Sequence, residues 1–196
     1  RPLAPDPKEP EHLAATVQYF KLKHCVITSV TRDDLKDEGA QHWVDCIEAV
    51  RRRSPSVTIE VLVPDFHARP ELIQKVADAS PDIFSHNIET VRRLTPQIRS
   101  VAQYDRSLDV LRIAFSMGLR VKSGIMVGLG ETMEEISETL KDIKSTGAGI
   151  ITIGQYLQPR RENHEVEKYY TPEEFDYIRK MALDMETFIP ATPFGI

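Results

Sequence analysis

The chain alternates between short apolar runs and segments whose apolar residues recur every three or four positions. The short runs are rich in β-branched residues, and HCVITSV (residues 24–30) is the first of them. Runs of this length and composition are typical of buried strands. The pattern predicts five strands, at residues 24–30, 57–63, 82–87, 119–128 and 149–157.

The intervening segments have the period of amphipathic helices, and two of them begin with a recognisable cap. Thr132 is followed by Glu135, and Thr171 by Glu174, which is the spacing of a capping box. The apolar positions predict helices at residues 37–53, 71–79 and 105–117, after Thr132, and from Thr171 to about residue 186.

Strands that alternate with helices favour an α/β protein with a parallel sheet and right-handed crossovers. The strands are apolar on both faces, as expected where helices cover a sheet. A complete eight-fold barrel needs about 250 residues. With 196 residues, the chain could form either a partial barrel or an open doubly wound sheet. Both place ligand sites at the carboxyl ends of the strands.

Composition narrows the classes of protein and of partner. The length suits one domain, with a core over residues 1–186 and a tail over residues 187–196. A formal charge of −5 predicts no nucleic-acid partner, and no apolar run approaches the roughly 18 residues of a membrane span. The two cysteines form no disulfide framework, and the first residues do not resemble a signal peptide. We expect a cytoplasmic protein.

Polar residues follow every predicted strand. A ligand pocket at the carboxyl edge of the sheet would explain them, and ordinary polar turns and helix caps would explain any one of them alone. In chain order they are Thr28, Ser29, Arg32, Asp33 and Asp34; Pro64, Asp65 and His67; His86, Asn87 and Glu89; Gly128, Gly130 and Glu131; and Gln155, Tyr156 and Gln158. Taken as a set, they favour a pocket.

The stretch KSGIMVGLGET (residues 122–132) contains three glycines after an apolar run. Their order is GxxxGxG, which matches neither the dinucleotide fingerprint nor the Walker loop. Gly124 inside the strand and Gly128 at its end suit a flat ring lying against bare backbone. A tight turn with positive φ would account for Gly130.

Six stretches resemble the lipoyl synthases of the radical SAM superfamily, in that family's order and spacing. They are TSVTRDDL (28–35), EVLVPDF (60–66), HNIETVRRL (86–94), YDRSL (104–108), KSGIMVGLGET (122–132) and TIGQYLQP (152–159). The resemblance covers residues 2 to about 186, and it implies a partial (β/α)6 barrel of the TIM type, of which this chain has strands 2 to 6.

That family inserts two sulfur atoms at C6 and C8 of a protein-bound octanoyl group. The resemblance implies S-adenosylmethionine as cofactor, two 4Fe-4S clusters, and octanoylated lipoyl carrier domains as partners, from 2-oxoacid dehydrogenase E2 and the glycine cleavage H protein. It also implies a monomer. The cofactor and clusters carry the radical chemistry, while the protein positions and shields it.

The resemblance assigns residues to the cofactor but identifies no catalytic residue. Lys122 lies within its strand, so its charge needs an interior partner or a route to solvent. By resemblance, Ser29 and Asp33 lie near the methionyl end, Asn87 and Glu89 approach the ribose and carboxylate, Gly128, Gln155 and Tyr156 frame the adenine, and Lys122 belongs to the same set.

The sequence also departs from the family. It has no CxxxCxxC loop, no second cysteine triad and no RSSY motif, and Cys25 and Cys46 have no other cysteine at ligand spacing. We therefore expect no metal ligands in this chain and place the cluster-binding segments outside it, which makes the 196 residues alone inactive.

Two alternatives remain. A truncated product could bind a ligand or partner without generating a radical. A barrel enzyme without iron could use Asp33, His86 and Glu89 as acid, base or metal ligands.

Several arginines lie in or after loops on the predicted pocket side, namely Arg92, Arg93, Arg99, Arg106, Arg160 and Arg161. An acidic lipoyl carrier domain could be steered by such charges. A merely solvated face would explain each of them equally well. Charge reversal at Arg92 and Arg93 is predicted to slow turnover on carrier protein while sparing octanoyl-peptide substrates.

Overall fold

The computed structural model describes residues 2–99 and 101–185. The strands are β1 (His24–Thr28), β2 (Thr58–Leu62), β3 (Ile83–Ser85), β4 (Val121–Val127) and β5 (Ile150–Gln155). The α-helices are α1 (Glu9–Tyr19), α2 (Ala40–Arg53), α3 (Pro70–Asp78), α4 (Thr95–Ile98), α5 (Tyr104–Ser116), α6 (Met133–Ser145) and α7 (Pro172–Leu183), and one short turn, η1, spans Phe66–Ala68.

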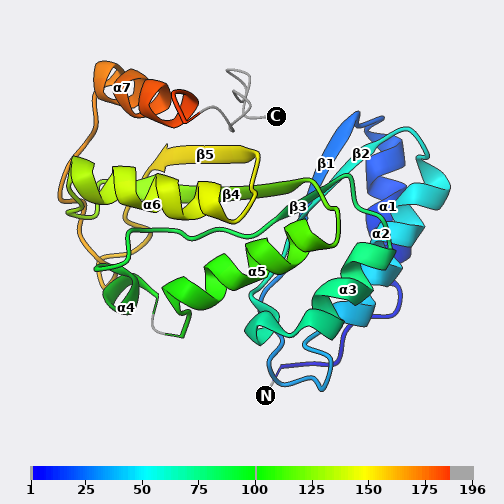
Figure 1. Ribbon diagram of the computed structural model, residues 1–196. Helices are drawn as coiled ribbons and strands as arrows, with labels where there is room; N and C mark the ends of the chain where they lie inside the picture. The colour runs from blue at the N-terminus through cyan, green and yellow to red at the C-terminus, as the bar shows by residue number, and fades with distance from the viewer. Residues whose placement is uncertain (1, 100, 186–196) are drawn as a thin grey trace.

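The five strands form one parallel sheet in the order β1-β2-β3-β4-β5. A doubly wound sheet reverses its strand order at a switch point, and this sheet does not. The chain is therefore a partial barrel, as predicted, and the doubly wound alternative is wrong. The strands curve across Figure 1, with β1 and β5 at opposite edges.

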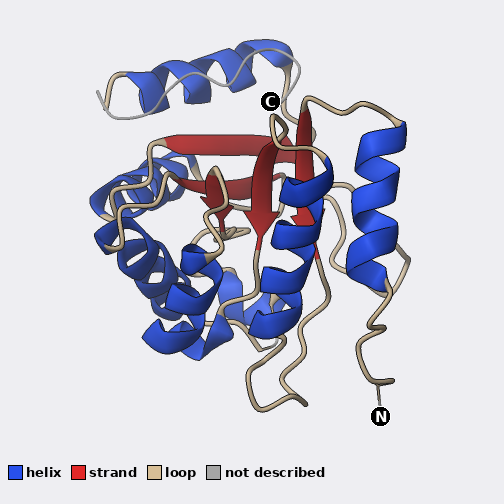
Figure 2. Cartoon of the chain, turned by 90° about the vertical axis from the view of Figure 1, so that its right-hand side faces the viewer, coloured by secondary structure: helices blue, strands red, loops and turns tan. Residues whose placement is uncertain are grey.

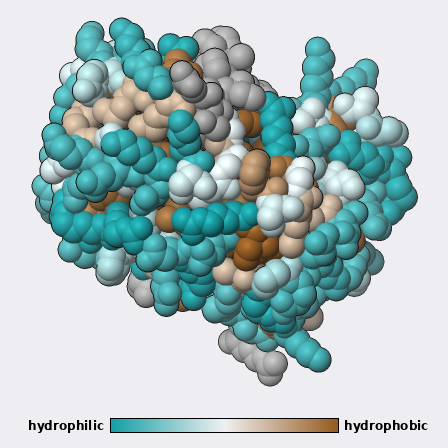
Figure 3. Space-filling view, viewed as in Figure 1, coloured by the Kyte–Doolittle hydropathy of each residue, from teal (hydrophilic) through white to brown (hydrophobic). Residues whose placement is uncertain are grey.

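The helices cover one side of the curved sheet and contact one another in a row, α1 with α2, α2 with α3, α3 with α5, α5 with α6, and α6 with α7. Figure 2 shows the same arrangement from the side, with helices outside the strands. The main core fills the space between the two layers, where Ile59, Phe84 and Leu111 are fully buried. The outer face in Figure 3 is mostly hydrophilic.

All five predicted strands and all five predicted helices are present, with ends that differ by a few residues. Both capping boxes are confirmed: the hydroxyls of Thr132 and Thr171 accept from the backbone N–H groups of Glu135 and Glu174. The expectation that both faces of the strands are covered fails in β1, where Cys25 and Ile27 are buried but Val26 is 50% exposed.

The pattern missed two helices. The buried face of α1 consists of Pro10, Ala14 and Val17, which is too weakly apolar to give a helical signal. The connector around Pro96 contains the single turn α4. None of the helices within the described ranges is long and apolar enough to cross a membrane.

Two loops near the carboxyl edge have left-handed backbone without glycine. Phe66, His67 and Ala68 have φ of 44°, 48° and 53° in η1, and Glu38 has φ of 49° just before α2. Such a conformation costs about 1–2 kcal/mol for a residue with a Cβ. Surrounding contacts must therefore hold these residues in place.

Candidate functional site

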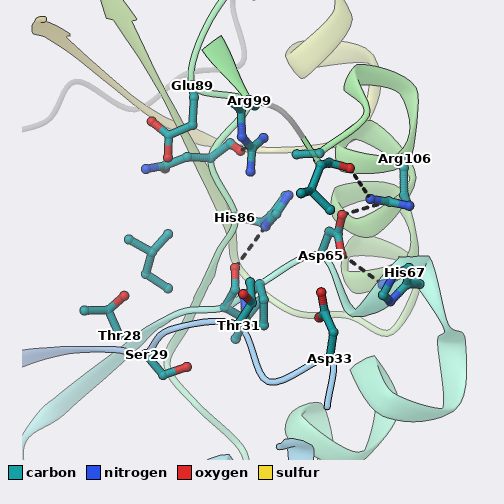
Figure 4. Close-up of a pocket in the computed structure, with 16 residues that line it drawn as sticks. Thr28, Ser29, Thr31, Asp33, Asp65, His67, His86, Glu89, Arg99 and Arg106 are labelled. Atoms are coloured by element: carbon teal, nitrogen blue, oxygen red, sulfur yellow. Dashed lines mark hydrogen bonds and ion pairs between the residues drawn. The ribbon is translucent and has the colours of Figure 1, made fainter. Parts of the chain in front are cut away.

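A cavity of about 260 Å³ lies at the carboxyl ends of β1, β2 and β3 (Figure 4), and we call it the β1–β3 pocket. Its polar lining is Thr28, Ser29, Thr31, Asp33, Asp65, His67, His86, Asn87, Glu89, Arg99 and Arg106. Drug-sized ligands occupy pockets of about 300–1,000 Å³. The β1–β3 pocket thus has room for a polar part of such a ligand.

Four of the eight predicted cofactor residues line this pocket, namely Ser29, Asp33, Asn87 and Glu89. Ser29 follows β1 directly and donates its hydroxyl to the carbonyl of Val30 at 3.0 Å. Asp33 is exposed. The polar residues after separate strands therefore converge, as the parallel arrangement predicted.

Glu89 is held in the pocket by its backbone. It has φ of 69°, and its N–H donates to the Gly124 carbonyl at 3.1 Å while its own carbonyl accepts from Met126 at 2.7 Å. A strained backbone that is fixed by a neighbouring strand presents its side chain in one place, and such strain often occurs at functional sites.

Two arginines complete the pocket. Arg106 Nε donates to Asp65 Oδ2 at 2.7 Å. Arg99 is half-buried, and its Nη1 donates to the Asn87 carbonyl and to Ser107 Oγ, each at 3.3 Å. Burial lowers the pKa of Arg99 from its ordinary value. Sequence reasoning grouped both with the surface arginines, because an irregular connector and the start of α5 give no signal that they turn inward.

His86 is buried and already has two partners. Its Nδ1 lies 2.9 Å from the Val63 carbonyl and its Nε2 lies 3.0 Å from Ser107 Oγ. Burial lowers the pKa of His86 to about 4. At neutral pH it is an uncharged structural residue with both nitrogens in use. His86 therefore has no nitrogen available as an acid, a base or a metal ligand. This disfavours the alternative of a non-iron enzyme that acts through Asp33, His86 and Glu89.

Lys122 lies near the amino end of β4, away from the pocket. Its ammonium pairs with Glu60 at 3.0 Å, and the Ser85 hydroxyl donates to the same carboxylate at 2.8 Å. His24 lies 3.6 Å from Glu60. The predicted need for an interior partner is thus met by Glu60, which the sequence reading did not single out. The role of Lys122 at the cofactor stays a prediction.

The other three predicted residues lie together at what we call the β4–β5 corner, formed by Gly128, Glu131, Gln155, Tyr156 and Tyr170. The Gln155 amide donates to the carbonyls of Tyr156 and Lys168 and accepts from the Tyr170 N–H. The Tyr156 hydroxyl donates to the His164 carbonyl at 2.9 Å. These side chains hold the loop after β5, and their contact with adenine stays a prediction.

The glycines of the stretch KSGIMVGLGET are required mainly by the chain itself. A Cβ on Gly128, which has φ of 105°, would lie 2.3 Å from Gln155 Nε2 and 2.5 Å from the Lys168 carbonyl. A Cβ on Gly124 would lie 2.7 Å from Asn87 Oδ1. Gly130 has φ of 95° and more space, which fits the predicted tight turn.

Glu131 closes the same turn. Its carboxylate is buried and accepts from the backbone N–H groups of Gly128 at 2.6 Å and Leu129 at 2.9 Å, and from the Tyr170 hydroxyl at 2.8 Å. The backbone donors that a phosphate would need are therefore occupied by a carboxylate from the chain.

The residues present do not fit an iron–sulfur cluster. Such clusters need several cysteine thiolates, and the chain has two cysteines. Cys25 and Cys46 are both buried free thiols. Burial raises the pKa of both, to about 11 for Cys46. Both behave as small core residues, as the sequence suggested.

Most of the predicted docking arginines pair with acids of the chain. Arg92 pairs with Asp105 at 2.7 Å and Asp142 at 3.3 Å, and Arg93 pairs with Glu135 at 2.7 Å. Arg160 has a looser contact with Glu162 at 3.8 Å. Arg161 is exposed in the same loop.

Known proteins resemble the chain in sequence. The family model of the radical SAM superfamily matches residues 2–143. The lipoyl synthase of Parabacteroides distasonis is 52% identical over 184 residues, which are 94% of this chain and 66% of that protein. The lipoyl synthase of Phocaeicola vulgatus is 52% identical over 93% of this chain and 64% of its own length. The chain thus spans slightly less than two thirds of these curated relatives.

Solved structures agree on the fold. Methylornithine synthase (PylB) superposes with a TM-score of 0.70 at 14% identity, over 92% of this chain and 54% of that one. Streptococcus suis SuiB bound to S-adenosylmethionine gives a TM-score of 0.70 at 10% identity, over 95% of this chain and 42% of that one. At these identities the likeness concerns the fold alone.

Proposed function

Because the chain belongs to the radical SAM superfamily, we propose that it is the barrel core of a lipoyl synthase. The observation that carries the proposal is the 52% identity to curated lipoyl synthases over 94% of the chain. The pocket adds support, since residues from three strands and two arginines converge where barrel enzymes bind ligands.

The proposed reaction is the insertion of two sulfur atoms at C6 and C8 of a protein-bound octanoyl group. S-adenosylmethionine, when bound beside a reduced cluster, supplies the radical that abstracts hydrogen. The cluster ligands are proposed to come from polypeptide outside these 196 residues, because Cys25 and Cys46 are buried and separate. The isolated chain is then expected to form no product, and its proposed location is the cytoplasm.

Within this chain, the β1–β3 pocket is proposed to bind the polar end of S-adenosylmethionine. The Glu89 carboxylate can pair with the cofactor's amino group, and the Ser29 hydroxyl and Asn87 amide can hydrogen-bond to its oxygens. Arg99 has a guanidinium with five donors, of which Nη1 binds Asn87 and Ser107. It can therefore orient the pocket wall and attract a carboxylate.

Calorimetry with S-adenosylmethionine tests the pocket. We expect weak binding, with Kd above about 1 µM, because no cluster iron ligates the cofactor. Glu89→Gln should weaken binding about tenfold, which is the value of one charge-assisted hydrogen bond. Glu134→Gln, at an exposed site on α6 outside the pocket, is the matched control. Submicromolar affinity, or equal affinity in all three proteins, would contradict this arrangement.

The proposed partners are octanoylated lipoyl carrier domains of 2-oxoacid dehydrogenase E2 and the glycine cleavage H protein. Arg92 and Arg93 are neutralised by acids of the chain, so Arg160 and Arg161 are the better candidates for steering. The experiment is carrier binding at two salt concentrations by the Arg160→Glu/Arg161→Glu variant. Arg112→Glu, on the outer face of α5, is its control. Equal binding by both variants would remove the arginine loop from the interface.

A further inference from the structure

A second group of ligand-type side chains lies beside the pocket, and the function proposed above does not use it as a group. Asp33, Glu38 and His67 each offer an oxygen or nitrogen atom, and these atoms all lie within 4.8 Å of one another. We call them the Asp33–Glu38–His67 cluster. Figure 4 shows Asp33 and His67 on the same side of the pocket as Asp65.

The cluster comes from two separate loops. Asp33 and Glu38 lie between β1 and α2, whereas His67 lies in η1 after β2. Because β1 and β2 are parallel neighbours, both loops leave the sheet at the same edge. The left-handed conformations of Glu38 and His67 then turn their side chains toward each other.

Glu38 has an unsatisfied oxygen that points into the cluster. The residue is 7% exposed, and Arg69 Nη1 donates to its Oε1 at 3.3 Å. Its Oε2 is buried and accepts no hydrogen bond from the described residues, although His67 Nδ1 lies 3.0 Å away. A buried carboxylate oxygen without a donor is costly, about 1–3 kcal/mol or more. A cation bound between Glu38 and His67 would satisfy it.

We propose that the Asp33–Glu38–His67 cluster binds a divalent transition-metal ion. One imidazole and two carboxylates form a donor set that suits Zn²⁺, Fe²⁺ or Mn²⁺. Two ligands of a tetrahedral Zn²⁺ ion lie about 3.4 Å apart, close to the 3.0 Å between Glu38 Oε2 and His67 Nδ1. Asp33 and His67 are exposed, so Asp33 can adjust and water can fill the remaining positions.

The local charge favours a cation. Apart from His67, Arg69 is the base that pairs with Glu38 among the described residues, and it also pairs with Glu71 at 2.8 Å. The three carboxylates of Asp33, Glu38 and Glu71 therefore outnumber the single guanidinium. Arg69 also fixes Oε1 of Glu38, which leaves Oε2 for the ion.

This site differs from the Asp33, His86 and Glu89 set that the sequence suggested. Both nitrogens of His86 are occupied by Val63 and Ser107. The inference does not depend on S-adenosylmethionine, on a cluster or on lipoyl chemistry.

The experiment is a calorimetric titration of Zn²⁺ into the metal-free protein. One ion per chain is expected, with Kd at or below about 1 µM. His67→Asn should weaken binding at least about tenfold, and asparagine tolerates the φ of 48° at this position. Glu38→Gln should have a similar effect while keeping the shape of the side chain.

His42→Asn is the matched control. His42 Nε2 also contacts a carboxylate, Glu9 Oε2 at 2.7 Å, but no described residue completes a three-ligand group there. This variant should bind Zn²⁺ like the unchanged protein. X-ray absorption of the zinc-loaded protein should show one imidazole nitrogen, and His67→Asn should remove it even if Glu38→Gln fails to fold.

Three results would overturn the inference. The first is the absence of a one-to-one complex with Kd below about 100 µM. The second is binding that His67→Asn leaves unchanged within about twofold. The third is Mg²⁺ binding as tight as Zn²⁺ binding, because magnesium avoids imidazole and would indicate a nonspecific acidic surface.

Discussion

The β1–β3 pocket and the β4–β5 corner lie along the same carboxyl edge of one sheet, but their polar groups are used differently. At the corner, Gln155, Tyr156 and Glu131 are bonded to backbone or side chains of the chain itself. In the pocket, Asp33 and Glu89 line an open cavity. A glycine-rich stretch with polar neighbours can therefore mark a self-contained turn as well as a ligand site.

The largest expected effect concerns Lys122, which forms an interior ion pair with Glu60. Lys122→Met should lower the free energy of unfolding by about 3–5 kcal/mol, because the buried Glu60 carboxylate loses its ammonium partner and keeps only the Ser85 hydroxyl and the more distant His24. Urea denaturation measures it. Lys168→Met, which breaks the more exposed pair with Glu174, should cost at most about 1 kcal/mol. Equal losses would mean that Lys122 is free to serve a ligand.

Gly128 tests whether the corner is filled by the chain. Gly128→Ala should cost about 3 kcal/mol, because the methyl group meets Gln155 and the Lys168 carbonyl at positive φ. Gly130 also has a positive φ, but a methyl group there would have space. Gly130→Ala should therefore cost only about 1–2 kcal/mol. Thermal unfolding compares them. If Gly128→Ala were the milder change, the space over Gly128 would be open to a ligand.

His86 lines the β1–β3 pocket, but its hydrogen bonds go to other groups of the chain, as they do at the β4–β5 corner. The pH dependence of stability tests whether it is as closed to solvent as the corner residues. Its pKa is about 4 in the folded protein because of burial, against about 6.5 when unfolded. Well above pH 6.5 neither state is charged. As the pH falls from about 6.5 toward 4, the unfolded chain binds a proton at His86 and the folded chain does not. The free energy of unfolding therefore decreases.

Between pH 7 and pH 5 this loss should be about 2 kcal/mol, measured by urea denaturation at each pH. His86→Gln should be less stable at pH 7 but should show a smaller decline with acid. An unchanged slope in the variant would mean that His86 titrates normally and is open to solvent.

The smallest expected effect is at Tyr170, whose hydroxyl donates to Glu131 at 2.8 Å. Tyr170→Phe should cost about 1.5 kcal/mol, the value of one hydrogen bond to a carboxylate. Tyr169→Phe is the neighbouring control, since that side chain is 68% exposed and should change nothing. If Tyr170→Phe left the stability unchanged, the position of Glu131 would not depend on the loop after β5.

The sheet could be predicted because each strand is a short apolar run bounded by polar residues. Parallel pairing followed from the helices between the strands, and the capping boxes at Thr132 and Thr171 located two helix starts. Helix α1 could not be found in this way, because Ala14 and Val17 bury too little apolar surface to show a period.

The candidate site was predictable in part, for a related reason. Strand ends locate Ser29, Asn87 and Glu89, since parallel strands finish at one edge. They do not locate Arg99, which turns inward from an irregular connector. Nor do they locate Glu60, which forms an interior ion pair with Lys122. Contacts between residues far apart in sequence leave no local pattern.

The order of the strands has a consequence for how the chain acquires its structure. Each strand pairs with the one before it in sequence, from β1 to β5. During synthesis, which proceeds from the amino terminus, every new strand therefore finds its neighbour already made. Among the described strands, β1 is the exception, because its partner β2 is translated after it. The sheet can grow in the direction of translation, one βα unit at a time.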